Sequence, residues 1–168
     1  MIHVCSLARL HATVEETGAR RVVTLMRDVE LVRRPPTIEH TGHLLLRLDD
    51  ISEPLDGYTV PAAEHIAELL AFVRAWDRAA PLVMHCYAGV SRSTAGAFVS
   101  ACALNPRRSE IDIAQDIRRL SPTATPNIRI VTLADQILGR DGRMVTAVTA
   151  IGRGIECYEG HPFRLDLI

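Results

Sequence analysis

Short runs of β-branched and leucine residues alternate along the chain with longer stretches of helical periodicity. This alternation is typical of an α/β layer fold, in which helices connect and cover strands. The runs with strand character are Ile2–Val4, Arg21–Met26, His43–Leu48 and Leu82–His85. We therefore expect a central, mostly parallel sheet flanked by helices. His43–Leu48 is predicted to be a central strand, because it is apolar on both faces.

The first long helical stretch carries apolar residues three and four positions apart. A helix is expected between Pro61 and Ala79, and a buried one over Ser93–Leu104, which is almost wholly small or apolar. Ser109 is expected to cap a further helix. A final long helix is predicted over Asn127–Leu138, closed by a glycine. The tail, Gly152–Ile168, is expected to be a strand or an extended cover.

Length and composition favour one globular domain spanning residues 1–168. The chain has 168 residues, 48% of them hydrophobic, which is enough for a core without disulfides or metals. All 19 basic residues are arginine, so no lysine is available for a Walker-type phosphate loop, a Schiff base or an amine nucleophile. The formal net charge of −1 does not indicate binding to nucleic acid or to an anionic membrane surface.

The cysteines indicate neither a metal site nor a disulfide framework. Cys5, Cys86, Cys102 and Cys157 are scattered and have no ligand spacing. The segment Met1–Gly18 lacks a basic region followed by an apolar core, and no apolar run is long enough to span a bilayer. We therefore expect a cytoplasmic protein with reduced cysteines, no metal and no membrane insertion.

The segments that follow two of the strands are expected to meet. His43–Leu48, the helix after Pro61 and Leu82–His85 form a plausible βαβ unit, which places both strands parallel in one sheet. The segments Asp49–Pro54 and Cys86–Arg92 should then lie at the same carboxyl edge. Open α/β sheets bind their ligands at this edge.

The second of these segments has the chemistry of an anion site. Backbone N–H groups converge in a turn between a strand and a helix, and the helix N-terminus adds partial positive charge. The same field favours the thiolate of Cys86, which is the nucleophilic form of cysteine. Arg92 presents a planar fork that can grip two phosphate oxygens. A hydroxyl near the sulfur, such as that of Ser93, could stabilise the sulfur as a leaving group.

The stretch "HCYAGVSRS", residues 85–93, resembles the His-Cys-x5-Arg-Ser/Thr signature of the cysteine-dependent protein tyrosine phosphatase superfamily. The short chain is similar to its dual-specificity-type branch and to small bacterial-type tyrosine phosphatases, over roughly residues 40–140. The resemblance implies that Cys86 attacks phosphorus, that Arg92 stabilises the equatorial oxygens, and that water hydrolyses the cysteinyl-phosphate without a metal or cofactor. His85 would orient the loop. The residues expected to bind phosphate are Tyr87, Ala88, Gly89, Val90, Ser91 and Arg92.

The resemblance also implies an aspartate that protonates the leaving oxygen, about 30 to 40 residues before the cysteine. Asp49 and Asp50 lie 37 and 36 residues before Cys86. Asp50 is favoured because it matches the acidic position one residue beyond the strand, whereas Asp49 is expected to cap or hydrogen-bond the loop. Asp56, at 30 residues, is a third candidate. Asn127 resembles the asparagine of the Pro-Asn pair that opens the last major helix, and would orient water or the loop.

The predicted function is hydrolysis of phosphomonoesters, with phosphotyrosine or phosphoserine and phosphothreonine in a protein or peptide as substrate. A phosphoinositide or another small phosphate ester is the alternative within this class, although the loop lacks the lysines that such relatives often carry. A rhodanese-like sulfurtransferase or an arsenate reductase would also use a cysteine loop. A phosphate-binding pseudophosphatase is the non-enzymatic alternative. The sequence does not indicate an oligomeric state.

Overall fold

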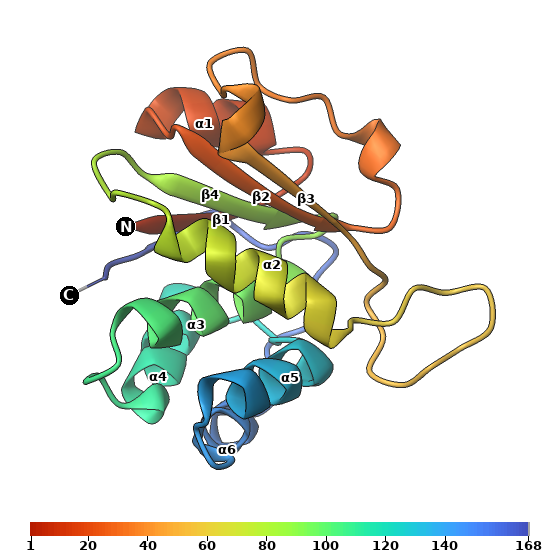
Figure 1. Ribbon diagram of the computed structural model, residues 1–168, viewed down its shortest axis with the longest axis vertical. Helices are drawn as coiled ribbons and strands as arrows, with labels where there is room; N and C mark the ends of the chain where they lie inside the picture. Colours follow the sequence, from red (N-terminus) through yellow and green to blue (C-terminus); the bar gives the residue numbers. More distant parts are fainter. Residues whose placement is uncertain (168) are drawn as a thin grey trace.

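A twisted five-stranded sheet forms the centre of the computed structural model, which describes residues 1–167 (Figure 1). Within these residues the strand order is β3-β2-β4-β1-β5. The first four strands are parallel, and only β5 runs antiparallel, alongside β1. The expected mostly parallel α/β sheet is thus confirmed. The strands are β1 (Ile2–Ser6), β2 (Arg21–Met26), β3 (His43–Arg47), β4 (Leu82–Cys86) and β5 (Phe163–Leu165).

The placement of β3 at the centre was wrong, because β3 is an edge strand. Leu44 and Leu46 face the larger core, but Leu45 lies on the opposite face of the strand and is 46% exposed. The helix that covers this opposite face makes its main contacts with β1 and β4 rather than with β3. An unbroken leucine run therefore indicated burial on two faces where only one is covered.

The helices divide unequally between the two faces of the sheet (Figure 1). Helix α1 (Leu10–Thr17) covers one face over a small apolar cluster. Five helices cover the other face and the larger core. The most buried of them, residues Arg92–Leu104, packs against the sheet, and its Phe98 is fully buried. These five are α2 (Ala63–Arg74), α3 (Arg92–Leu104), α4 (Glu110–Leu120), α5 (Ile128–Leu138) and α6 (Arg143–Ile151).

The fifth of these helices, α6, was not predicted, so α5 is not the final helix. No Ser, Thr, Asp or Asn at its start supplies a cap, since Gly142 occupies the N-cap position. The cap comes from α5 instead, where the Asp135 carboxylate accepts hydrogen bonds from the N–H groups of Gly142, at 2.7 Å, and Met144, at 2.8 Å. A cap supplied from the preceding helix leaves no local sequence signal.

Most other boundaries match their predictions to within one or two residues. The helix after Pro61 is shorter than expected, because α2 ends at Arg74. Ser109 stands at the N-cap of α4, yet its side chain makes no capping hydrogen bond. The tail contains β5 and an extended cover, as expected, while Ile168 lies outside the described residues.

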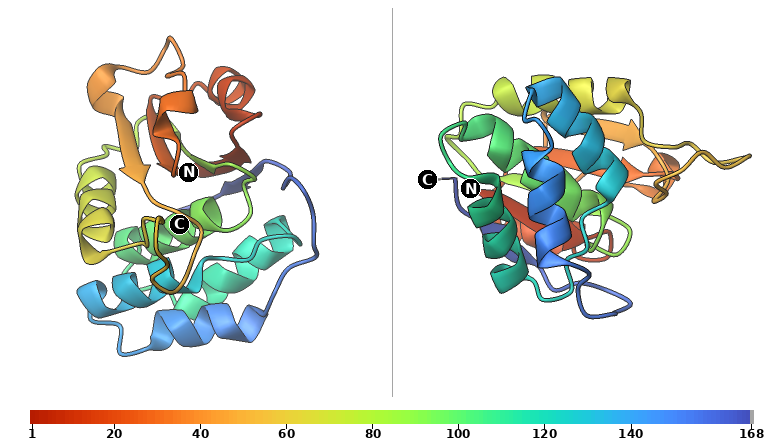
Figure 2. Two further views of the ribbon diagram at one scale, coloured as in Figure 1. Left: turned by 90° about the vertical axis from the view of Figure 1, so that its right-hand side faces the viewer. Right: turned by 90° about the horizontal axis from the view of Figure 1, so that it is seen from below.

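Parallel pairing brings the loops that follow β3 and β4 to one edge of the sheet. Strands β3 and β4 are not neighbours in the sheet, because β2 lies between them. The loop of residues 51–60 projects away from the body of the protein at this edge (Figures 1 and 2). Within residues 1–167, no helix is both long enough and apolar enough to cross a membrane.

Candidate active site

Cys86 is the last residue of β4, and its side chain is almost completely buried. Its Sγ atom lies 3.1 Å from the Oγ atom of Ser93, the second residue of α3. The N–H of Gly89 also points at the sulfur, with an N to Sγ distance of 3.3 Å. The thiol is therefore surrounded by hydrogen-bonding groups of the turn that joins β4 to α3.

The phosphate loop, residues 86–92, is held from outside by hydrogen bonds to its carbonyl groups. The N–H donors come from three other segments, and their N to O distances are 2.9 to 3.3 Å. In a trans peptide the C=O and N–H groups point in opposite directions, and the described chain has no cis peptide. The outward carbonyls therefore turn the following N–H groups inward. The pairs are Leu7 N to Tyr87 O, Gly160 N to Ala88 O, Thr125 N to Val90 O and Asn127 N to Ser91 O.

Gly89 is the one residue of this loop with a left-handed backbone, at φ 73°. A Cβ atom at this position would come within 2.8 Å of the backbone of Cys5 and Ser6 in β1. Backbone atoms of a central strand cannot move aside cheaply. The loop can therefore pass this close to β1 only with glycine at position 89.

The N-terminus of α3 is left open to an anion. Ser91 occupies the N-cap position, yet its side chain makes no capping hydrogen bond. Its hydroxyl instead donates to Asp50 Oδ1 at 2.7 Å. The first N–H groups of any helix have no acceptor within the helix, and here the usual side-chain acceptor points elsewhere. These groups and the helix dipole favour an anion at this end of the helix.

Arg92 carries a buried N–H donor that has no hydrogen-bond partner in residues 1–167. Its Nη1 donates to the Leu48 carbonyl at 3.1 Å, which holds the guanidinium across the end of β3. Its Nε is the only buried side-chain nitrogen or oxygen without a hydrogen-bond partner in residues 1–167. Such an unpaired donor costs about 1–3 kcal/mol. An oxyanion bound beside Cys86 would supply the missing acceptor.

Asp50 is the candidate acid that the structure brings to this loop. Its Oδ1 accepts hydrogen bonds from the Ser91 hydroxyl and from Asn127 Nδ2, at 2.7 and 2.8 Å. Its Oδ2 lies 4.0 Å from Arg92 Nε and accepts no hydrogen bond in the described part of the chain. The side chain is 38% exposed, so a substrate can reach it.

Neither Asp49 nor Asp56 makes a hydrogen bond or an ion pair with the phosphate loop in residues 1–167. Asp49 is buried and closes the base of the projecting loop, where its Oδ2 accepts from Thr59 N and its own N–H donates to Thr59 O, both at 2.7 Å. Arg27 lies 3.7 Å from its other oxygen. Asp56 is exposed within the projecting loop. The expected hydrogen-bonding role of Asp49 agrees with this geometry.

Asn127 performs two tasks with one side chain. Its Oδ1 accepts from the N–H groups of Arg129 and Ile130 and so caps α5. Its Nδ2 donates to Asp50 Oδ1 at 2.8 Å. The cap and the link to Asp50 fix both ends of the amide. The same residue therefore ties α5 to the candidate acid.

His85 is held by a chain of hydrogen bonds that sequence reasoning missed. Its Nδ1 lies 3.4 Å from the Cys86 carbonyl, and its Nε2 lies 2.7 Å from Thr24 Oγ1. The Thr24 hydroxyl also lies 2.8 Å from His43 Nε2. The Cys86 carbonyl can only accept, so His85 carries its proton on Nδ1. Thr24 then donates to His85 and accepts from His43.

Both rings are neutral near pH 7. Burial lowers the pKa of His85 to about 4, and burial likewise lowers the pKa of His43 to about 4. Between pH 6.5, the ordinary histidine pKa, and about pH 4, these two histidines bind protons in the unfolded chain but stay neutral in the folded chain. The two rings therefore make the fold lose stability as the pH falls through this range. His43 and Thr24 carried no sequence signal, because only the assembled sheet brings them together: Thr24 is opposite His85, and His43 is opposite Val22, two residues before Thr24.

The other cysteines and the acidic residues form no second site in residues 1–167. Burial raises the pKa values of Cys5 and Cys102 to about 12, so both stay protonated. Cys157 is exposed. No group of three or more His, Cys, Asp or Glu side chains in this part of the chain could hold a metal ion.

Comparisons with known proteins point to one class. The family model described as "Protein-tyrosine phosphatase" matches residues 56–123, which contain the phosphate loop. The fold is similar to PTP-2 phosphatase of Cydia pomonella, at 19% identity and a TM-score of 0.63, over 80% of this chain and 84% of that one. A search of curated proteins finds no match.

Dual-specificity phosphatases share the fold as well. Human DUSP28 is 17% identical with a TM-score of 0.63, over 80% of this chain and 86% of its own. DUSP15 is 15% identical with a TM-score of 0.65, over 89% and 90%. The expected resemblance to the protein tyrosine phosphatases is confirmed over residues 56–123, where the family model matches, and the solved dual-specificity phosphatases share the fold.

Replacing Thr24 with valine tests the hydrogen-bond chain behind the loop. Valine keeps the shape but leaves His85 Nε2 without a donor, so we expect the free energy of unfolding in urea to fall by about 1–3 kcal/mol. Thr24→Ser keeps the hydroxyl and should lose clearly less. Equal losses in the two variants would show that the hydroxyl does not hold the ring.

Proposed function

We propose that the protein is a phosphatase that hydrolyses phosphotyrosine in proteins through a cysteinyl-phosphate on Cys86. The observation that carries the proposal is the unpaired, buried Arg92 Nε beside inward-facing peptide N–H groups and a buried thiol. The arginine nitrogen and the peptide N–H groups can each donate a hydrogen bond to an oxygen of a phosphate monoester. Residues 1–168 would form a single catalytic domain.

In the first step, Cys86 Sγ attacks phosphorus, so that an S–P bond forms while the P–O ester bond breaks. The N–H groups of the loop and Arg92 stabilise the equatorial oxygens, in which negative charge is concentrated. Because these donors are already in place, little reorganisation accompanies the reaction. Ser93, 3.1 Å from the sulfur, would stabilise the thiolate when the S–P bond breaks in the second step.

Asp50 would act as the general acid. Its Oδ1 is occupied by Ser91 and Asn127, so Oδ2 is the oxygen that can carry the proton. That proton passes to the leaving phenolate oxygen. In the second step the same oxygen removes a proton from the water that attacks phosphorus, and inorganic phosphate is released. Such acid-base catalysis contributes about 10²–10⁴-fold.

Exposed apolar side chains at the site favour an aryl phosphate in a peptide. Tyr87 directly follows the nucleophile and is 66% exposed, and Ile128 directly follows Asn127. Leu55 and Tyr58 are exposed on the projecting loop, which directly follows Asp50. A flat, apolar ring suits such surroundings better than a hydroxyl-rich inositol. The absence of lysine also weakens the phosphoinositide alternative.

The remaining alternatives make different predictions. A sulfurtransferase or arsenate reductase would not need a carboxylate held against the phosphate loop, as Asp50 is. A pseudophosphatase would bind phosphate through the same N–H groups without turnover. Because the nucleophile, the arginine and a candidate acid are all present, the hydrolytic reading is stronger.

Cys86→Ser gives the primary test. The purified protein should hydrolyse an aryl phosphate such as p-nitrophenyl phosphate without added metal, and vanadate should inhibit it. The Cys86→Ser variant should lose at least about 10³-fold in kcat, because an alcohol is a far weaker nucleophile than a thiolate. Activity that survives this substitution would refute the proposal, whereas binding of phosphopeptide by the parent without turnover would favour the pseudophosphatase.

The second test separates the two neighbouring aspartates. Asp50→Asn should lower kcat for phosphotyrosine peptide by about 10²-fold or more, because no proton reaches the leaving oxygen. The loss should shrink for an aryl phosphate with a nitrophenol leaving group, which needs little protonation. Asp49→Asn should lower stability more than kcat, since Asp49 closes a loop. The opposite ranking would move the acid to Asp49.

A further inference from the structure

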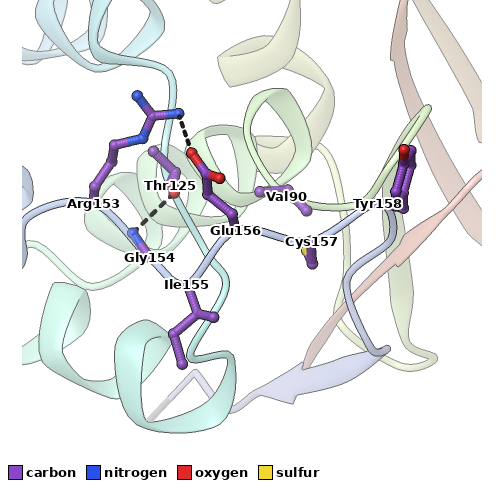
Figure 3. A pocket seen from close by; sticks show the side chains of 8 residues that line it. All are labelled: Val90, Thr125, Arg153, Gly154, Ile155, Glu156, Cys157 and Tyr158. Atoms are coloured by element: carbon purple, nitrogen blue, oxygen red, sulfur yellow. Dashed lines mark hydrogen bonds and ion pairs between the residues drawn. The ribbon is translucent and has the colours of Figure 1, made fainter.

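The segment of residues 153–160, here the C-terminal strap, crosses the outside of the phosphate loop after α6 (Figure 3). It is attached at two points. At its start, Gly154 N donates to Thr125 Oγ1 and Ile155 N donates to Pro122 O, both at 3.0 Å. At its end, Gly160 N donates to Ala88 O at 2.9 Å, and the Glu159 carboxylate accepts from the Ser6 hydroxyl.

The end of the strap acts on the peptide unit that touches the sulfur. The Ala88 carbonyl accepts from Gly160, and the N–H on the opposite side of the same peptide is that of Gly89. Gly89 N–H points at Cys86 Sγ at 3.3 Å. A trans peptide is planar, so fixing its carbonyl fixes its N–H. A hydrogen bond from the strap therefore sets the direction of one of the inward-facing N–H groups of the phosphate loop. These N–H groups are here called the phosphate cradle.

The fit at this end is tight, and Glu159 holds it in register. A Cβ on Gly160 would lie 2.9 Å from the Gly89 carbonyl, so no larger residue fits without a shift. Ser6, the donor to Glu159, is the last residue of β1 and pairs with Cys86 across the sheet. The carboxylate thus anchors the strap to the strand beside the nucleophile.

Between its two attachments the strap spans a pocket of about 500 Å³ and carries exposed side chains. Glu156 pairs only with Arg153 on the strap itself, at 4.0 Å, in the described part of the chain. Tyr158 is fully exposed. Strap residues therefore fall into an anchored set and a free set, which gives matched controls.

We propose that Glu159 and Gly160 are positioning residues for the phosphate cradle, acting through the Ala88–Gly89 peptide. The proposal rests on the proposed function, because it deepens the account of the same site. The strap lies outside the segment that the family model matches, so this element is additional to the matched region. The proposal does not require Glu159 or Gly160 to contact the substrate.

The experiment compares Glu159→Ala with Glu156→Ala in the full-length chain. Both remove one carboxylate from the same strap, but only Glu159 is anchored to Ser6. We expect Glu159→Ala to weaken binding of inorganic phosphate about tenfold, as for the loss of one charge-assisted hydrogen bond, with a similar fall in kcat/KM for an aryl phosphate. Glu156→Ala should stay within about twofold of the parent.

Glu159→Gln distinguishes positioning from charge, because the amide oxygen can still accept from Ser6. It should restore most of the phosphate affinity. Gly160→Ala is the second variant, and it should weaken phosphate binding without changing either carboxylate. If Glu159→Ala binds phosphate like Glu156→Ala, or if the affinity falls only in proportion to a lower Tm, the strap does not position the cradle.

The phosphate titration also separates this proposal from the proposed function. Phosphate affinity is measured by calorimetry and needs no turnover. Loss of phosphate affinity in Glu159→Ala, in a protein whose hydrolysis does not depend on Cys86, would support the strap and refute the hydrolytic mechanism. Hydrolysis that depends on Cys86 but is equal in Glu159→Ala and Glu156→Ala would support the hydrolytic mechanism and refute the role of the strap.

Discussion

The site depends on the orientation of the peptide units between Cys86 and Arg92. Free N–H groups do not gather around a sulfur by themselves, because each peptide could also turn its carbonyl inward. Here four carbonyls are bonded from outside by N–H donors of the β1–α1 turn, the segment before α5 and the C-terminal strap. The donors therefore stay in place without a ligand, which is the condition for strong electrostatic stabilisation of an oxyanion.

The polar side chains around the loop also hold the site while leaving donors free for a ligand. Ser91 leaves its capping position to bond Asp50, so the helix N-terminus stays open. Asn127 caps one helix and holds the same carboxylate. Arg92 is anchored through one nitrogen and keeps another unpaired. The protein thus retains an uncompensated donor where a structural site would have satisfied it.

The sequence could predict those parts whose signal is local. The strand ending at Cys86, the small-residue loop and the buried helix follow one another directly, and Asp50 lies just beyond another strand. Apolar spacing located α2, an almost wholly small and apolar run located α3, and a capping residue located α4, for the same reason. What the sequence could not show depends on distant partners. The edge position of β3, the cap that Asp135 gives α6 and the contact of Thr24 with two histidines all require the finished sheet.

The most direct measurement is a crystal structure of the protein soaked with vanadate or phosphate. The account predicts an oxyanion beside Cys86 Sγ, with one oxygen roughly 2.7–3.2 Å from Arg92 Nε and others bonded by the inward N–H groups of the loop. A loop that turned carbonyl oxygens toward the sulfur, or an Arg92 Nε left unpaired with the ion bound elsewhere, would contradict it.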